Sequence, residues 1–171
     1  RPTSDARSMS PPPRRAAGPG HTYVFPTAPE LEYDCPAGTA GPYFFEADPK
    51  KLTQRSWKNR LVGIDRSIID KHVWYGSNSS DKTQQAYSSE TNPWGLYDCL
   101  GNVYEWCQDW YGEYSDEAQI DPHGPATGNV RVGRGGDFYQ HFKIPRSASR
   151  LLYFPDKRER EVGVRLLRAV H

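Results

Sequence analysis

Apolar residues along the chain occur in short groups, separated by polar stretches that are rich in glycine and proline. Such a pattern predicts a few short strands, one clear helix and much ordered loop. Long periodic elements are not expected anywhere in the chain.

The one clear helix is predicted at residues 27–33. A capping box begins there at Thr27 and is completed by Glu30, with a proline between them in the first turn. Leu31 and Tyr33 are the expected buried anchors, and the helix should end by residues 36–38.

Short strands and turns account for most of the remaining pattern. Residues 130–138 alternate like a strand that runs into a kink at its two adjacent glycines. The other expected elements are a strand at 43–45, a short helix or irregular insertion around Ile64 to Ile69, an apolar anchor at 73–75, and strands at 146–152 and 162–167.

Residues 92–111 hold three of the chain's five tryptophans and two of its three cysteines. One proline and two glycines break this stretch, and no period survives, so the pattern predicts a loop. A solvated loop would not carry so many large rings, because burying each ring removes a large apolar area from water. We therefore expect a buried loop whose backbone is satisfied locally, with Asp98, Asn102 and Glu105 as candidates.

Length, charge and cysteine content limit the function classes. With 171 residues the chain is long enough for one domain with a single core. Its formal net charge of +1 argues against a nucleic-acid binder. The chain has no run of eighteen apolar residues, and its first residues are not apolar. We therefore expect neither membrane insertion nor a signal peptide. Cys35, Cys99 and Cys107 are not at metal-ligand spacing and allow at most one disulfide.

Residues 1–21 are rich in proline and arginine and have little to bury. We expect a linker or tail there and one folded domain over residues 22–171. The arginines of the tail could contact an acidic partner, so docking through the tail is a further expectation.

Several motifs occur together and in order, and the arrangement resembles the formylglycine-generating enzyme family, also called the sulfatase-modifying-factor family. The resemblance covers roughly residues 23–168. It implies an α+β domain with a variant of the C-type lectin fold, with few short strands and much irregular ordered loop. The matching segments are the helix start at residues 25–33, the Trp-rich centre at 92–106, the Arg-Gly-Gly turn at 134–136 and the ending at 162–165.

The family usually carries a substantial N-terminal portion before this helix. The resemblance therefore implies that the chain lacks this portion, or that a partner or a neighbouring segment supplies it.

Two positions imply that the chain is not an enzyme of this family. The enzymes that oxidise a sulfatase cysteine hold copper through two cysteines after the Arg-Gly-Gly turn. In this chain those places are Gln140 and Pro145. Neither side chain offers the soft sulfur ligand that Cu(I) prefers. We expect a pseudoenzyme without copper.

The central loop of the family often holds calcium. Carried over to this chain, the ligands are the side chains of Asp98 and Glu105 and main-chain carbonyls near Gly101 and Val103. Calcium takes several hard oxygen ligands, including carbonyls in irregular loops. The open alternative is that the two carboxylates cap local amides or meet Arg134 or Arg165.

The segments that follow the Arg-Gly-Gly turn line the ligand-binding face or the active-site groove in this fold, and here they are rich in aromatic and apolar residues. An exposed apolar patch usually marks an interaction site. Because strand side chains alternate, some should point inward, and at least two of residues 151–154 should point outward. The candidate ligand-binding residues are Phe138, Tyr139, Gln140, His141, Phe142, Ile144, Ser149, Leu151, Leu152, Tyr153 and Phe154.

A narrower resemblance concerns the variable proteins of diversity-generating retroelements, which use this fold and this stretch as a mutable surface. Their changed codons give residues such as Tyr, His, Phe, Ile, Ser and Leu, and most of the candidates belong to that set. The resemblance implies a non-catalytic module with a hypervariable surface that binds a protein or other macromolecular ligand.

Two alternatives stay open. One is an accessory or sensor domain of the sulfatase-modifying-factor type, attached to another component. The other is an enzyme with an unrecognised site, for which His141 with Asp137 or Asp156 is the one acid–base pairing that the sequence offers.

Overall fold

A computed structural model describes residues 15–16, 22–46, 66–140 and 145–169, and the predictions at Ile64, His141, Phe142 and Ile144 lie outside these residues. Seven short strands and two short helices make up the regular structure of the described part. They are β1 (Arg15–Ala16), β2 (Thr22–Val24), α1 (Ala28–Asp34), α3 (Ile69–His72), β3 (Tyr104–Trp110), β4 (Arg131–Arg134), β5 (Arg150–Tyr153), β6 (Val162–Gly163) and β7 (Leu167–Ala169).

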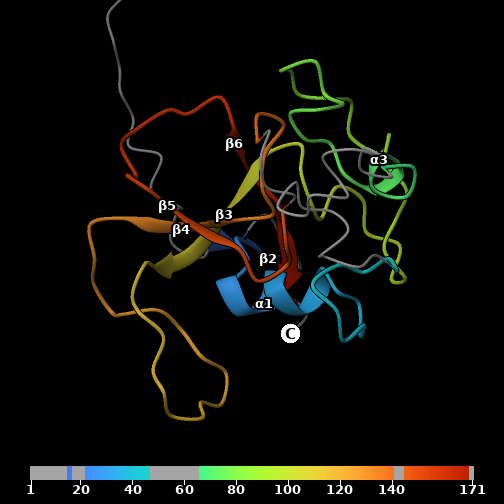
Figure 1. Cartoon of the computed structure of the whole chain (residues 1–171). Helices are drawn as coiled ribbons and strands as arrows, with labels where there is room; N and C mark the ends of the chain where they lie inside the picture. The colour runs from blue at the N-terminus through green and yellow to red at the C-terminus, as the bar shows by residue number, and fades with distance from the viewer. Residues whose placement is uncertain (1–14, 17–21, 47–65, 141–144, 170–171) are drawn as a thin grey trace, which may run out of the picture.

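The strands form two small sheets. One has the order β5-β4-β3-β6, in which β3 and β6 are parallel and the other pairs are antiparallel. The other has the order β1-β2-β7 and is antiparallel, and its β1 lies within the residues predicted as a tail. In Figure 1, α1 lies below the arrows of β3, β4 and β5, and α3 lies to the right among the green loops. Much of the chain is loop, as the sequence predicts. None of the described helices is both long enough and apolar enough to span a bilayer.

The helix α1 begins at the predicted capping box. The amide of Glu30 donates to the Thr27 hydroxyl at 3.3 Å, and the Thr27 amide donates to the Glu30 carboxylate at 2.6 Å. Asp109 of β3 adds a second cap by accepting the Ala28 amide at 2.7 Å. The start and the end of this helix are therefore confirmed.

One buried anchor of this helix was predicted wrongly. Leu31 is buried, but Tyr33 is 69% exposed. Successive helical residues are about 100° apart, so a residue two positions after Leu31 points away from the sheet. Tyr33 instead packs its ring against Trp94, with the centroids 5.3 Å apart.

The second half of the Trp-rich stretch is a strand rather than the predicted loop. β3 spans Tyr104–Trp110 and lies between β4 and β6, with its first four residues all buried. A strand that is buried on both faces has no alternation of polar and apolar residues, so hydrophobic periodicity in the sequence does not reveal it.

The first half of that stretch is an irregular buried loop, as expected. The side-chain oxygen of Asn92 accepts the amides of Trp94 and Leu96, each at 3.0 Å. The side-chain oxygen of Asn102 accepts the Gln84 amide at 2.9 Å. These asparagines supply the local partners that the irregular backbone needs.

The other predicted strands and the second helix were only partly confirmed. The kink after β4 and the strands of the C-terminal part are confirmed, although β5, β6 and β7 are shorter than the predicted segments. A short helix is present only at residues 69–72. Residues 43–45 form bends rather than a strand, and Tyr43 and Phe44 are buried because they pack into the cluster around Ile69 and Leu100.

Gly101 lies at the closest approach between two backbone segments. Its amide donates to the Gly135 carbonyl at 2.7 Å, and the next amide, of Asn102, donates to the Trp74 carbonyl at 2.8 Å. Its φ is +80°, and a Cβ there would lie 2.2 Å from the Trp74 oxygen. Only glycine can adopt this φ without strain and also leave room for the Trp74 backbone.

We predict that Gly101→Ala destabilises the fold far more than Gly38→Ala. Gly38 also has a positive φ, of +83°, but nothing lies within 4 Å of its Cβ position. Gly38→Ala should lower the free energy of unfolding by about 1–2 kcal/mol, the cost of a left-handed alanine. Gly101→Ala adds a backbone clash that costs about 1–3 kcal/mol more. Urea unfolding measures both, and equal losses would contradict the close approach.

Candidate functional site

The predicted surface lies at one edge of the four-stranded sheet. β5 is the edge strand, and within the described residues β4 is its only strand partner. The exposed fractions are 51% for Tyr139, 40% for Leu151, 44% for Leu152 and 53% for Phe154. Three of residues 151–154 therefore point outward, in agreement with the expectation of at least two.

Two of the predicted surface residues are core residues. Phe138 is only 2% exposed and Tyr153 only 8% exposed. The Tyr153 ring packs edge-to-face against Tyr104 at 5.6 Å and against Trp106 at 5.8 Å. Burial raises the pKa of the Tyr153 hydroxyl and raises that of Tyr104 to about 12. Tyr153 fits there because Gly133, its neighbour on β4, has no side chain in the way. Neither ring can contact a partner.

The sheet register divides the exposed residues between two faces. Directly paired residues point to the same face, and successive residues point to opposite faces. Leu152 pairs with Val132, which packs against α1, so Leu152 faces the α1 side. Leu151 pairs with Gly133 and therefore lies on the other face, with Tyr153. The predicted single patch is in fact an edge that is apolar on both sides.

Residues 137–140 are fixed to the core by their own polar groups. The Tyr139 amide donates to Asp137 at 2.6 Å, and the Gln140 carbonyl accepts the Gly76 amide at 3.2 Å. The Gln140 side chain also donates to the Tyr104 hydroxyl. The guanidinium of Arg160 lies 4.9 Å from the centre of the Tyr139 ring. Gln140 is half-buried, as is Ser149.

The second of the two positions compared with copper ligands is also structural. Pro145 is fully buried. Its ring packs against Gly136, where an added Cβ would lie 2.3 Å from the Pro145 Cβ. Gly136 also has a φ of +85°, so this position needs glycine both for its backbone conformation and for the close contact with Pro145.

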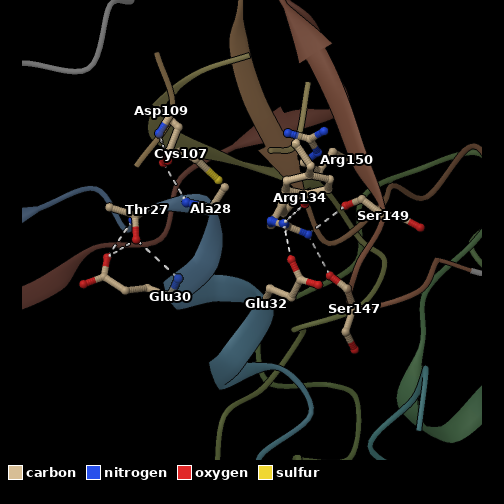
Figure 2. A network of polar contacts seen from close by, with 12 residues as sticks. Thr27, Ala28, Glu30, Glu32, Cys107, Asp109, Arg134, Ser147, Ser149 and Arg150 are labelled. Carbon is tan, nitrogen blue, oxygen red and sulfur yellow. Dashed lines mark hydrogen bonds and ion pairs between the residues drawn. The ribbon is translucent and has the colours of Figure 1, made fainter. Parts of the chain in front are cut away.

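Arg134 of β4 holds the chain that leads into β5 (Figure 2). One guanidinium nitrogen donates to the carbonyls of Ser147 at 3.0 Å and Ser149 at 3.4 Å. The other pairs with the Glu32 carboxylate of α1. Arg134 is only 2% exposed, so these partners replace part of the water that it loses, and its Nε has no hydrogen-bond partner among the described residues.

A pocket of about 470 Å³ lies on the α1 side of the sheet, between α1 and the loop after β3. Arg150 projects into it and is covered by Tyr114, with the charge 3.7 Å from the ring centre. This pocket was not predicted from the sequence, because residues 121–125 indicate a turn and no pattern in the loop at 112–125 indicates a cavity. Glu32, Trp110 and Val132 also line it.

Of the four predicted calcium ligands, the two carboxylates have the partners that the open alternative names, an arginine for Glu105 and a local amide for Asp98. Both oxygens of Glu105 meet Arg165, at 2.7 and 2.8 Å. Asp98 accepts the Ser89 hydroxyl at 2.7 Å and the Tyr87 amide at 3.1 Å. Burial raises the pKa of Glu105, and the charge of Arg165 opposes that shift.

In this arrangement Arg165 supplies to Glu105 the positive charge that the prediction gives to the metal. Across residues 15–16, 22–46, 66–140 and 145–169, no group of three or more His, Cys, Asp or Glu side chains could hold a metal ion. A site at Gly101 and Val103 with two carboxylates stays a prediction.

Comparison with known proteins agrees with this architecture. Residues 4–170 match the family described as the sulfatase-modifying factor enzyme 1-like domain. The formylglycine-generating enzyme of Streptomyces coelicolor is 32% identical over 151 residues, which are 82% of this chain and 45% of the relative. The chain thus spans less than half the length of this relative.

Two solved structures are also similar. Treponema denticola variable protein 1 has a TM-score of 0.67 and 29% identity, and the match covers 85% of this chain and 47% of that protein. PvdO from Pseudomonas aeruginosa has a TM-score of 0.67 and 26% identity, and the match covers 86% of this chain and 53% of that protein. The predicted fold class is confirmed.

We predict a large loss of stability for a substitution at the last residue of β5 and a small loss for one at the residue that follows it. Tyr153→Ala should lower the free energy of unfolding by roughly 3 kcal/mol, because it empties a ring site in the core. Phe154→Ala should change it by less than about 0.5 kcal/mol, because that ring is mostly in solvent. Thermal and urea unfolding measure both. A large loss at Phe154 would contradict the division into core and surface residues.

We also predict that Arg165, and not calcium, neutralises Glu105. Glu105→Gln should lower the free energy of unfolding by roughly 3 kcal/mol, because it leaves a largely buried guanidinium without its counter-charge. Glu90→Gln is the control and should have little effect, because the Glu90 side chain is 60% exposed and lies 3.7 Å from His72. EDTA should leave the melting temperature unchanged. A melting temperature that rises with added Ca²⁺ would support the ion instead.

Proposed function

Since the chain belongs to the sulfatase-modifying factor enzyme 1-like family, we propose that it is a non-catalytic member that binds a protein ligand. The binding site is the edge of the four-stranded sheet, which we name the β5-edge surface. It consists of the exposed residues Leu151 and Leu152 of β5 and of Phe154, which follows the strand.

One observation carries this proposal: the exposed apolar side chains of β5 and of its following residue lie on both faces of an edge strand. Proteins normally protect sheet edges with charged side chains, proline or a covering segment, because an open edge invites pairing with another chain. A ligand that lies along β5 would contact Leu151 on one face and Leu152 on the other. A small molecule bound to one face would reach only one of them.

The residues beneath this surface support a binding role. Phe138 and Tyr153 hold the backbone in place from inside the core, and Gln140 is tied to Tyr104. Substitutions at the exposed positions would therefore change the ligand contacts and leave the scaffold intact. A variable binding surface needs this separation, and a variable protein of Treponema denticola has a similar structure.

The absence of catalysis is part of the proposal and rests on two positions. Gln140 and Pro145 stand where the resemblance expects copper-binding cysteines, and neither side chain can act as a thiolate ligand. Both have structural roles, in a hydrogen bond and in a buried turn respectively.

The test uses peptides selected from a random displayed library against the wild-type chain. Phe154→Ala and Leu152→Asp should each weaken the selected peptides at least about tenfold, as expected for anchors worth about 1.4 kcal/mol or more. Ile120→Ala is the matched control, because Ile120 is 94% exposed and lies far from β5 in the sequence. Calorimetry measures the affinities, and circular dichroism checks the fold.

Equal affinities for the wild type and the β5 variants would overturn the binding site. Conversion of a sulfatase-type cysteine peptide to formylglycine by the copper-treated chain would overturn the non-catalytic role. Sequencing the 3′ end of the gene across related isolates tests variability, which should concentrate at the exposed positions and spare Phe138 and Tyr153.

A further inference from the structure

Two cysteines that are 64 positions apart in the sequence meet in the core. Cys35 is the C-terminal cap of α1, and Cys99 lies in the central loop. The Cys35 thiol donates to the Cys99 carbonyl oxygen at 3.4 Å, and the two thiols lie close enough for each to shift the pKa of the other. The two are 5% and 9% exposed.

A polar frame holds the two segments in this arrangement. The side-chain amide of Asn92 donates to the carbonyls of Asp34 at 2.7 Å and Cys35 at 3.2 Å. The same nitrogen lies 3.8 Å from the Cys99 sulfur. On the other side, the Ser147 hydroxyl lies 3.5 Å from the Cys35 sulfur. The contact between the thiols is therefore part of the fold and not a chance approach of two mobile side chains.

A small void adjoins both thiols. It has a volume of about 10 Å³, near the space of one water molecule, and Cys35, Cys99 and Gly135 are among the residues that line it. The two sulfurs therefore have some free space beside them for the rearrangement that a bond between them needs.

The third cysteine offers a contrast inside the same core. Cys107 is 0% exposed. The one hydrogen-bond acceptor that the structure gives for its thiol is the Glu105 carbonyl, at 3.8 Å. It packs against Ala28, Leu31 and Val132, as a small apolar side chain would.

We propose that Cys35 and Cys99 are a redox pair that closes to an intramolecular disulfide. The oxidant class is a small-molecule disulfide, with oxidised glutathione as the example. One protein thiolate attacks the glutathione disulfide and forms a mixed disulfide, and one glutathione leaves. The second protein thiol loses its proton and attacks the protein sulfur of the mixed disulfide, and a second glutathione leaves. Two protein sulfurs are oxidised, two glutathione sulfurs are reduced, and the two protein thiol protons end on glutathione.

The bond would join the end of α1 to the central loop and close a long loop of chain. Cross-linking positions far apart in sequence restricts the unfolded chain, so the oxidised form should be the more stable one. This inference does not depend on the proposed ligand.

The experiment refolds the full chain from denaturant in a glutathione redox buffer, so that burial in the native state does not limit access. Alkylation after denaturation, followed by mass spectrometry, counts the remaining thiols. The number of free cysteines should fall from three to one, with Cys107 as the alkylated residue. The disulfide-linked peptides should contain Cys35 and Cys99, and the melting temperature should exceed that of the reduced protein.

Three variants make the outcome decisive. Cys107→Ser is the matched control and should lose both remaining thiols on oxidation. Cys35→Ser and Cys99→Ser should each form no intramolecular disulfide. Three alkylatable cysteines in refolded soluble protein, a bond that includes Cys107, or a lower melting temperature on oxidation would each overturn the proposal.

Discussion

The buried guanidinium of Arg134 is the interaction on which the arrangement of the sheet, the helix and the C-terminal segment depends. It projects from β4, pairs with Glu32 of α1 and is only 2% exposed. Burying such a charge costs free energy that its partners must offset. By also holding the carbonyls of Ser147 and Ser149, it fixes the residues that lead into β5. The edge strand therefore has a defined position although it has only one described strand neighbour.

The sequence predicted the elements whose signals are local. The capping box at Thr27 and the paired glycines after β4 determine the backbone through contacts between neighbouring residues, and both were found. β3 was missed because it is buried on both faces, and residues 43–45 were misassigned because their rings serve the core without strand pairing. Tyr33 was misplaced because a two-residue step around a helix reverses the direction of a side chain.

The candidate site shows the same limit. Composition indicated an apolar C-terminal surface, but only the register of β5 on β4 decides that Tyr153 is core while Leu151, Leu152 and Phe154 are exposed. The pairing of Glu105 with Arg165, 60 positions away, was expected only as an alternative to calcium, because no local pattern in the sequence chooses between the two. The meeting of Cys35 with Cys99 was equally out of reach, since it depends on how α1 packs against the central loop.

The contact between Gly136 and Pro145 has a consequence for the evolution of this fold. Gly136 has a φ of +85°, and the Pro145 ring fills the space that a Cβ at position 136 would take. A larger residue at position 136 would therefore require a strained backbone and also a smaller residue at position 145. Related chains can change the first of these positions only if the second changes with it.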